Sequence, residues 1–338
     1  MKAVRIAQWG APPRIEVRPD PVPAPGRSLV RMQAATVGHI DRTVWRGGFL
    51  RPPPLPYTPG VEGAGIVVHS ERFAPGQRVW LRGSGLGTQF DGTWCEIADA
   101  PDAALGELPE GLDMALGSAF FSPCTSAWVA LHEVARVREG ERVMVTGASG
   151  AVGSLAVQLA LEIGAKVCAV VADASVDHGL PAGVDIVEWR PGIEAPSQEA
   201  EVLIDTVGGD VLAALLGRVL PGGRAVLIGY TAGETLSLSL PAFMQRDVSL
   251  LPLNMFRREA QGRASIARAI ERWAFAARGA TLRVRRSGTG AGVDRAARSS
   301  RPRGARRGLS FSATRRPLPA PRPSAHAHAA GSSAAACS

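Results

Sequence analysis

Short apolar runs, broken by proline and glycine, fill the first 110 residues of the chain. Strand-type composition marks SLVRMQAATV (28–37), AGIVVHS (64–70), QRVWLRG (77–83) and GTWCEIA (92–98), with proline-rich turns such as PDPVPAPG between the runs. Proline fixes φ and removes a hydrogen-bond donor, so such clusters separate strands. Many short strands with frequent turns predict a small β-barrel, which we place at residues 1–115.

From about residue 113 helical stretches alternate with apolar strands. Helices are expected over 112–121, 126–137 and near 210–219, and strands at 142–147, 166–172, 184–187, 201–207, 224–229 and 248–253. Strands that are apolar on both faces are typical of a parallel, doubly wound sheet covered by helices on both sides. The predicted fold class is therefore α/β, with this sheet over residues 116–256 and an amphipathic helix at 257–277.

The expected localisation of the protein and the expected state of its cysteines rest on sequence features that we do not find. We find no uncharged apolar run of about 18 residues and no secretory signal at the amino end, so we expect a cytoplasmic protein that spans no membrane. The four cysteines are scattered without a Cys-x-x-Cys pair. Neither a disulfide framework nor a closed zinc site is predicted.

The net charge of +8 comes from the carboxyl end of the chain. Residues 278–338 hold 13 arginines and one acid, Asp294, and without them 25 basic and 29 acidic residues remain. The body is thus mildly acidic, and a detached basic end is weak support for nucleic-acid binding.

A glycine turn between a predicted strand and a predicted helix carries the strongest functional signal. In RVMVTGASGAVGSLAVQLALEIG, Gly147, Gly150 and Gly153 follow the strand, and Gly164 ends the helix. Such glycines permit a tight turn and close approach of the backbone to a pyrophosphate, which the amides at the helix start can bind. The expected cofactor-binding residues here are Gly147, Ser149, Gly150, Ala151, Val152 and Gly153.

The end of the next strand should distinguish NAD from NADP, because an acid there binds the ribose hydroxyl and repels a 2′-phosphate. In VVADASVDH the acid is Asp173, with no Lys or Arg closely following. Two interpretations stay open: Asp173 is the ribose ligand, or it lies one residue too far along and caps the loop.

Several motifs together resemble the medium-chain dehydrogenase/reductase superfamily, and in particular its quinone-oxidoreductase-like branch. They are PYTPGVEGAGIVV, FAPGQRVW and DGTWCEI in the barrel, and VTGASGAVGSLAVQLALEIGAKV, VLIDTVGG, LPGGRAVLIG and RDVSLLPLNMFRREA in the sheet. The resemblance covers roughly residues 1–285. It implies a GroES-like catalytic barrel, a Rossmann domain and a return helix toward the barrel at 257–285, and it adds Thr206 and Gly229 to the expected cofactor site.

The resemblance also implies where zinc ligands would lie. Gly38 stands in place of the catalytic cysteine, Ile40 in place of the proton-relaying hydroxyl, Val61 in place of the histidine, and the third ligand position falls near Ser122. Glycine and valine side chains offer zinc no donor atom. We therefore expect no bound metal.

Without a metal, the substrate carbonyl must be polarised by hydrogen bonds. Zinc-free relatives generally place an asparagine at the position of Gly38, which this chain lacks, so His39 is the candidate donor; the alternative is a surface or ribose-contacting histidine. In PCTSAWVAL, Thr125 or Ser126 matches the hydroxyl residue that relatives pack beside the nicotinamide. We take Ser126 as the candidate catalytic residue. Both hydroxyls could equally be helix N-caps.

These features predict a zinc-independent oxidoreductase that transfers a hydride from NADPH to quinones or α,β-unsaturated carbonyl compounds. NADP(H) is favoured over NAD(H) by the resemblance, although Asp173 argues mildly against it. The expected partner is a small carbonyl or quinone substrate, with a homodimer left open. The alternatives are a catalytically impaired cofactor-binding protein and, third, nucleic-acid binding through the basic tail.

Residues 286–338 are predicted to be a disordered tail. Lysine occurs only at Lys2 and Lys166 against 36 arginines, which indicates a GC-rich coding sequence, and SSRPRGARRGLSFSATRRPLPAPRPSAHAHAAGSS has the composition of such a sequence read in a shifted frame. Too little apolar area is present to offset ordering entropy. We interpret the tail as a frameshift product that would impair activity.

Overall fold

A computed structural model describes residues 1–49, 51–258 and 267 of the chain. All of them belong to the compact unit Met1–Ser287. Residues 255–258 are helical and overlap the start of the helix predicted at 257–277. The predictions for the rest of 257–285 and for the tail at 286–338 lie outside the described residues.

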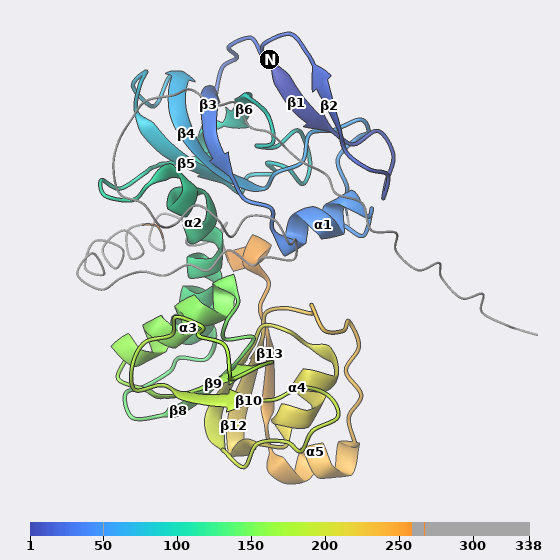
Figure 1. Ribbon diagram of the computed structural model, residues 1–338, viewed down its shortest axis with the longest axis vertical. Helices are drawn as coiled ribbons and strands as arrows, with labels where there is room; N and C mark the ends of the chain where they lie inside the picture. Colours follow the sequence, from blue (N-terminus) through green and yellow to red (C-terminus); the bar gives the residue numbers. More distant parts are fainter. Residues whose placement is uncertain (50, 259–266, 268–338) are drawn as a thin grey trace, which may run out of the picture. The chain divides into compact units, whose positions relative to one another are not determined.

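Antiparallel strands build the amino-terminal part of the protein, drawn in blue to teal in Figure 1. Five strands pair in the order β6-β3-β4-β5-β7, and a β1-β2 ribbon is linked to them by the bridges Ala3↔Cys95 and Ile6↔Tyr57. The strands are β1 Lys2–Arg5, β2 Arg14–Val17, β3 Arg27–Ala35, β4 Glu62–His69, β5 Arg78–Arg82, β6 Ile97–Pro101 and β7 Leu105–Glu107.

One strand prediction in the barrel is partly wrong. The run expected at 92–98 becomes strand β6 only from Ile97. The preceding amides of Gly92, Thr93 and Trp94 donate instead to the carbonyls of residues 58–60, at 2.7 to 2.9 Å. A loop from a distant part of the chain therefore satisfies these backbone groups in place of a neighbouring strand. Two short helices complete this part, α1 His39–Trp45 and the 3₁₀ turn η1 Asp102–Ala104.

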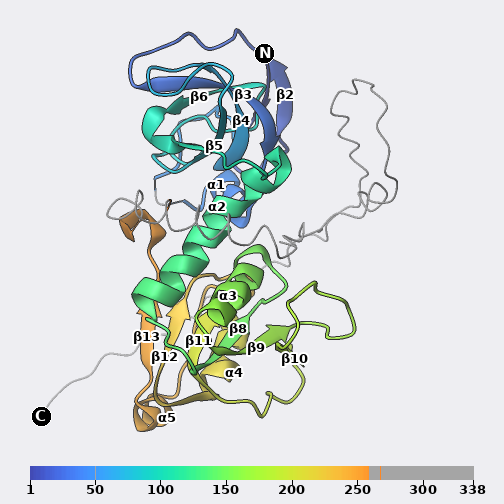
Figure 2. The same cartoon turned by 90° about the vertical axis from the view of Figure 1, so that its left-hand side faces the viewer.

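A single helical run leads from the barrel into the second part of the chain, where two separate helices were expected. It consists of α2 Met114–Trp128 and the π-helical turn η2 Val129–Val134, visible as one long green helix in Figure 2. Asp113 is its N-cap and accepts a hydrogen bond from the Leu116 amide at 2.6 Å. The N-cap alternative for Thr125 and Ser126 is therefore wrong, since both lie well inside α2.

The run Met114–Val134 is long and apolar enough to cross a membrane by length and composition, contrary to the sequence-based expectation of no such run. In the protein 56% of the apolar window is buried, and α2 packs against β3, β4, β5 and α3. Phe120, Phe121 and Cys124 are fully buried in the largest apolar cluster. A core helix of this kind passes the same length and composition test.

A six-stranded parallel sheet forms the second part, in the order β10-β9-β8-β11-β12-β13. This is the order of a Rossmann sheet, with the direction of winding reversing between β8 and β11. The α/β fold with a GroES-like part and a Rossmann sheet is thus confirmed. The elements are β8 Arg142–Thr146, α3 Ala151–Glu162, β9 Lys166–Val171, β10 Asp185–Glu188, β11 Ala200–Asp205, α4 Gly209–Leu216, β12 Val219–Leu227, α5 Leu240–Arg246 and β13 Ser249–Pro252.

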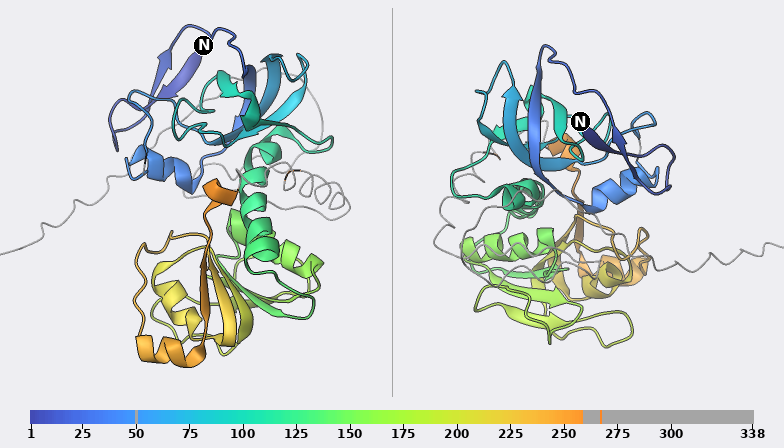
Figure 3. Two further views of the ribbon diagram at one scale, coloured as in Figure 1. Left: turned by 180° about the vertical axis from the view of Figure 1, so that it is seen from behind. Right: turned by 45° about the horizontal axis from the view of Figure 1, so that its top comes forward.

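Helices cover both faces of this sheet, and the alternation along β8 shows how. Val143 and Val145 belong to the apolar cluster that contains Leu155 and Leu159 of α3, whereas Met144 belongs to the cluster that contains Leu212 of α4. Successive side chains of a strand point to opposite faces, so each face of β8 has its own helix. In the left view of Figure 3, α4 and α5 (yellow to orange) lie across the sheet from α3 (green).

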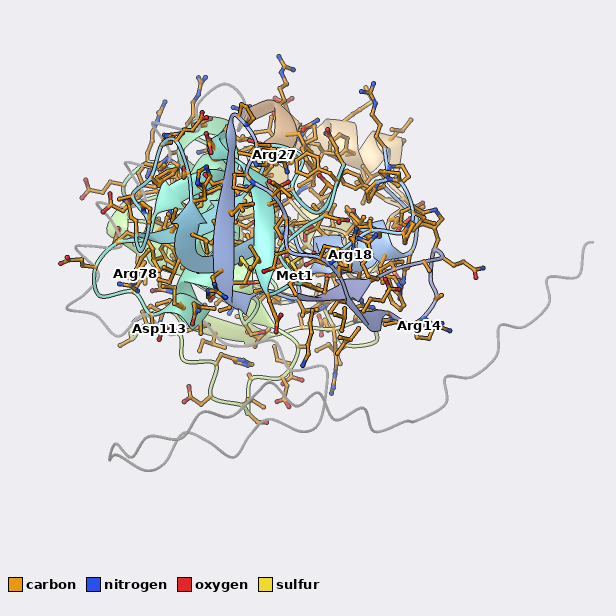
Figure 4. All side chains as sticks on the ribbon, turned by 90° about the horizontal axis from the view of Figure 1, so that it is seen from above. Met1, Arg14, Arg18, Arg27, Arg78 and Asp113 are labelled. Carbon is orange, nitrogen blue, oxygen red and sulfur yellow. The ribbon has the colours of Figure 1, made fainter. Side chains whose placement is uncertain are left out.

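Several arginines of the barrel lie apart from one another. Figure 4 labels four of them, and they lie well apart in that view. Arg18 pairs with Asp91 at 3.2 Å and Arg27 with Asp99 at 2.7 Å. Each of these two arginines is thus paired with a carboxylate.

Candidate cofactor site and reaction centre

The glycine turn joins β8 to α3 with very little spare room. Gly147 has φ +57°, and a Cβ atom added to it would lie 2.5 Å from Thr206 Oγ1. A Cβ on Gly153 would lie 2.2 Å from the Gly147 carbonyl oxygen. The Gly150 amide donates to that same oxygen at 2.8 Å. Gly147 and Gly153 are therefore required for the turn to close against its neighbours.

Gly150 differs from the other two glycines. A Cβ on Gly150 would meet only the Gly147 oxygen, at 3.2 Å, so its outer side is open to an approaching group. Gly150 is the N-cap of α3 and has no side chain to satisfy the helix amides. The first-turn amides of Ala151, Val152 and Gly153 have no partner within the helix, and the dipole adds positive potential there. The turn fits the pyrophosphate of a dinucleotide.

A buried hydrogen-bond network holds the turn against the end of β11. Asp205 is fully buried, and its carboxylate accepts from Thr146 Oγ1 at 2.6 Å and from the Gly208 amide at 2.8 Å. Thr206 donates its amide to Thr146 Oγ1 and its hydroxyl to the Thr146 carbonyl. Burial raises the pKa of Asp205. The carboxyl ends of β8 and β11, where a dinucleotide crevice opens in such sheets, are thereby locked together.

The loop after β12 packs onto this same edge. A Cβ on Gly229 would lie 2.2 Å from the Thr206 carbonyl oxygen, so the backbone there passes directly over the end of β11. The Ala232 amide donates to the Val207 carbonyl at 2.7 Å. Thr206 and Gly229, both predicted cofactor residues, are thus neighbours at the carboxyl edge of the sheet.

In the barrel, the positions that hold zinc ligands in metal-dependent relatives converge on one place. Asp41 accepts from the amides of Gly38 at 2.7 Å and Val61 at 3.0 Å, and the Ser122 amide donates to Glu62 Oε1 at 2.7 Å. Gly38, Val61 and Ser122 therefore surround a shared centre. Gly38 and Val61 offer a metal no donor atom, and the described residues contain no group of three or more His, Cys, Asp or Glu that could hold one.

The carboxylates at this centre are structural. Asp41 and Glu62 are each 2% exposed, and burial raises the pKa of Asp41 to about 6 despite its backbone hydrogen bonds. Glu62 lies directly opposite Arg82 in the β4–β5 register. Arg82 also donates to Thr125 Oγ1 at 2.9 Å. These contacts join α1, β4, β5 and α2 at the base of the site.

Comparison with known proteins identifies the family. Residues 24–110 match the alcohol dehydrogenase GroES-like domain. The chain is 33% identical over 245 residues to the acrylyl-CoA reductase of Ruegeria pomeroyi, covering 68% of this chain and 73% of that protein. It is 29% identical over 279 residues to human quinone oxidoreductase, covering 76% and 80%.

The chain belongs to the medium-chain dehydrogenase/reductase superfamily, in its quinone-oxidoreductase-like branch. The quinone oxidoreductase of Thermus thermophilus, solved alone and with NADPH, has the same fold, with a TM-score of 0.68 at 25% identity over 82% of this chain and 88% of that chain. The resemblance drawn from the sequence motifs is thereby confirmed.

Within this family framework the structure brings most predicted cofactor residues together. Gly147, Gly150 and Gly153 with Ser149, Ala151 and Val152 form the β8–α3 turn, and Thr206 and Gly229 lie beside it. Asp173 lies two residues beyond β9 and is exposed. Its Oδ1 accepts from the Ser175 amide at 2.9 Å and the Ser175 hydroxyl at 2.6 Å, which lower its pKa. In this structure Asp173 caps its own loop, and its ribose role stays a prediction.

Arg190 is a residue of this region that sequence reasoning missed. It follows β10, whose Glu188 pairs in register with Val171 of β9, and its charge contributes to lowering the pKa of Asp173. Arg190 is 61% exposed. Asp173 and Arg190 come into the same region because β9 pairs with β10. The two residues are well separated along the chain, so the sequence alone did not indicate that they are related.

The two candidate catalytic residues have different surroundings. Ser126 lies half-buried in α2, and its hydroxyl donates to the Ser122 carbonyl at 3.1 Å. His39 is the exposed first residue of α1, and partial burial together with Arg42 and Arg46 lowers its pKa. The lowered pKa favours the neutral imidazole, a form that can both donate and accept a hydrogen bond.

Proposed function

We propose that the protein is a zinc-independent, NADPH-dependent reductase of quinones or α,β-unsaturated carbonyl compounds. The observation that carries the proposal is the β8–α3 turn, where Gly147 and Gly153 close the loop and Gly150 leaves the helix amides open. The family to which the chain belongs supports an NAD(P)H-dependent oxidoreductase. Quinones and α,β-unsaturated thioesters as substrates are taken from the names of its relatives, quinone oxidoreductase and acrylyl-CoA reductase.

NADPH is favoured over NADH by the charge near the end of β9. Asp173 is already engaged by Ser175, and Arg190, which pairs with Glu188 at 3.7 Å, contributes through its charge to lowering the pKa of Asp173. A 2′-phosphate carries negative charge. The guanidinium group of an arginine binds such a phosphate more strongly than it binds an uncharged ribose hydroxyl. Arg190 is the group we assign to the 2′-phosphate.

The bound cofactor supplies the hydride, and the protein binds and orients both reactants. The amides of Ala151, Val152 and Gly153 would hold the pyrophosphate, and Thr206 supports the turn through its hydrogen bond to the Thr146 carbonyl. The rings of Phe49 and Phe256 lie 5.6 Å apart, and we assign them to the substrate entrance. Their apolar surface would favour a substrate with an apolar body and would limit access of water.

Turnover of purified full-length protein tests the proposal. NADPH oxidation should appear with a panel of quinones and enones, and kcat/KM should be at least tenfold higher with NADPH than with NADH. Arg190→Ala should raise the dissociation constant of NADPH about tenfold and leave that of NADH within twofold. Arg142→Ala is the matched control, because this exposed arginine sits at the amino end of β8 and pairs with Glu201.

Two results would contradict the proposal. NADPH binding by fluorescence with no turnover on the whole panel would favour a cofactor-binding protein without catalysis, which the missing side chain at Gly38 makes a reasonable second candidate. A preference for NADH in both binding and turnover would overturn the cofactor assignment alone.

A further inference from the structure

The aromatic rings of His39 and Tyr230 contact each other edge to face. Their centroids lie 6.0 Å apart and their planes are inclined by 74°. His39 begins α1 in the barrel part, and Tyr230 lies three residues beyond the end of β12. No local pattern in the chain connects two residues so far apart.

The backbone beneath Tyr230 is tightly packed, although its side chain is 47% exposed. A Cβ on Gly208 would lie 2.9 Å from Tyr230 Cα, and a Cβ on the preceding Gly229 would lie 2.2 Å from the Thr206 carbonyl oxygen. The Gly233 amide donates to the Tyr230 carbonyl at 3.2 Å. The phenol thus projects from a well-supported point, as a positioned functional group requires.

The contact lies on the half of the sheet where chemistry is expected. In a Rossmann sheet the first three strands, here β8 to β10, take the adenosine half of the dinucleotide, and the second three, here β11 to β13, take the other half. Tyr230 follows the carboxyl end of β12, so it belongs to the nicotinamide half. His39 is the barrel residue whose ring the structure places against it.

The reaction needs a hydrogen-bond donor that the usual positions do not supply. Gly38 and Val61 carry no polar side-chain atom, and reduction of an enone or quinone places negative charge on the substrate oxygen. A phenol O–H and a neutral imidazole are both able to donate to that oxygen. Tyr230 and His39 are two such groups in contact with each other.

Resting on the function proposed above, we propose that Tyr230 donates the hydrogen bond and the proton to the substrate oxygen, and that His39 returns a proton to Tyr230. The substrate gains the hydride of reduced nicotinamide at its β-carbon, and its C=C electron pair moves until the carbonyl oxygen becomes an enolate. The Tyr230 O–H bond breaks as the enolate oxygen takes the proton. The phenolate then takes the N–H proton from one ring nitrogen of His39 while the other ring nitrogen accepts a proton from solvent hydronium, so the imidazole stays neutral and each turnover consumes one hydride and one solvent proton.

Tyr230→Phe tests the hydroxyl while it keeps the ring. We expect kcat for an enone to fall at least 100-fold, the usual scale of general acid catalysis, with KM within threefold and the NADPH dissociation constant within twofold. Tyr57→Phe is the matched control: it is the only other tyrosine in the chain, and its buried hydroxyl has no hydrogen-bond partner among the described residues. Its kcat should stay within twofold of the wild-type value.

A second measurement needs no cofactor. In the NMR spectrum of the unliganded protein, Tyr230→Ala should shift the Cε1–H resonance of His39, assigned with His39→Asn, because an aromatic ring 6.0 Å away is removed. The double variant Tyr230→Phe/His39→Asn should be no slower than Tyr230→Phe, since both groups serve one proton transfer.

The outcomes separate this inference from the proposed function. If the wild-type protein reduces enones or quinones and Tyr230→Phe keeps more than a third of its kcat, the role of Tyr230 is overturned and the reductase assignment stands. An unchanged His39 resonance in Tyr230→Ala would overturn the pairing. If the wild-type protein fails on the whole substrate panel, the proposed function itself fails.

Discussion

A Cβ atom added to Gly150 would lie 3.2 Å from the Gly147 carbonyl oxygen, and one added to Gly153 would lie 2.2 Å from that same oxygen. Real Cβ contacts essentially never fall below 3.0 Å, so the two glycines are not equivalent. Gly153 permits the helix to pack on the turn. Gly150 keeps the approach to the helix amides open, so we expect a side chain there to affect dinucleotide binding more than the fold.

The first prediction separates these two roles. Gly150→Val should raise the dissociation constant of NADPH at least tenfold, about 1.4 kcal/mol, because its side chain obstructs the backbone amides. Its free energy of unfolding in urea should change little. Gly153→Ala should instead lower the free energy of unfolding by about 1–3 kcal/mol, the usual cost of overpacking.

Isothermal calorimetry and urea unfolding on the same samples check this. Gly217→Val is the control for adding valine beside a helix end. Gly217 lies at the carboxyl end of α4, and a Cβ atom on it would lie 3.3 Å from the Ala214 carbonyl oxygen. Undiminished NADPH affinity in Gly150→Val, with the fold intact, would remove this turn from the cofactor site.

Asp41 gives a second prediction, on pH. Burial raises its pKa to about 6, whereas an unfolded aspartate titrates near 3.9. The folded protein therefore holds this proton more tightly, and the stability contributed by Asp41 is complete below pH 4 and is lost as the pH rises to about 6. The loss amounts to about 3 kcal/mol, an order-of-magnitude figure.

Urea unfolding between pH 4 and pH 7 measures this effect. Relative to Asp41→Asn, the wild-type free energy of unfolding should decline across pH 4 to 6, while the exposed Asp210→Asn should follow the wild-type curve. Parallel wild-type and Asp41→Asn curves over that interval would show that Asp41 titrates normally in the folded protein.

At the scale of elements, the carboxyl edge of the sheet is held by side chains as well as by strand pairing. The β8–β11 register ends at Val145 and Ile204. Beyond it Thr146, Asp205 and Thr206 exchange hydrogen bonds that carry the pairing one residue further. The turns after both strands depend on these hydrogen bonds.

The third prediction concerns Thr146→Val. The substitution keeps the shape and removes the hydroxyl, so Asp205 loses a donor and the Thr206 amide loses its acceptor. Leaving buried polar groups unsatisfied should lower the free energy of unfolding by about 1–3 kcal/mol. Thr43→Val, which loses only a long, exposed bond to the His39 carbonyl, should change it by less than about 0.5 kcal/mol. If Thr146→Val and Thr43→Val lowered the free energy of unfolding in urea equally, the hydrogen bonds between the ends of β8 and β11 would have no special role.

At the scale of the whole molecule, the proposed function assigns the substrate to the barrel and the cofactor to the parallel sheet. Contacts such as His39–Tyr230 and Phe49–Phe256 join residues of the first 50 positions to residues after position 229. The barrel positions that hold metal in zinc-dependent relatives are here filled by Gly38 and Val61. Under the proposed function, protein hydrogen bonds would polarise the substrate.

The fourth prediction is that the purified protein contains well below one equivalent of zinc. Incubation with EDTA or phenanthroline should leave NADPH-dependent turnover within 20% of the untreated value (about 0.1 kcal/mol in the activation barrier). Elemental analysis by plasma emission and a parallel assay with added zinc check it. Stoichiometric zinc, or activity that disappears with the chelator and returns with the metal, would mean that the ligands lie elsewhere in the chain.

The sequence alone determined the fold class, the Rossmann turn and the family, because each is encoded locally. Wholly apolar strands alternate with helices, and Gly147, Gly150 and Gly153 stand between strand and helix. The turn needs glycine at fixed spacing wherever it occurs, so the signal survives without tertiary information. The single helical run Met114–Val134 was not predicted: the expected break at 122–125 contains Pro123, and α2 continues through that proline.

Only the tertiary structure decided which distant side chains meet. The convergence of Gly38, Val61 and Ser122, the neighbourhood of Asp173 and Arg190, and the contact of His39 with Tyr230 all join segments that no local pattern connects. Long-range pairing depends on strand order and loop packing, which the alternation of apolar positions leaves open. Motifs formed by neighbouring residues can therefore be predicted from the sequence of this protein. The partners of each candidate catalytic residue are defined only when the chain is folded.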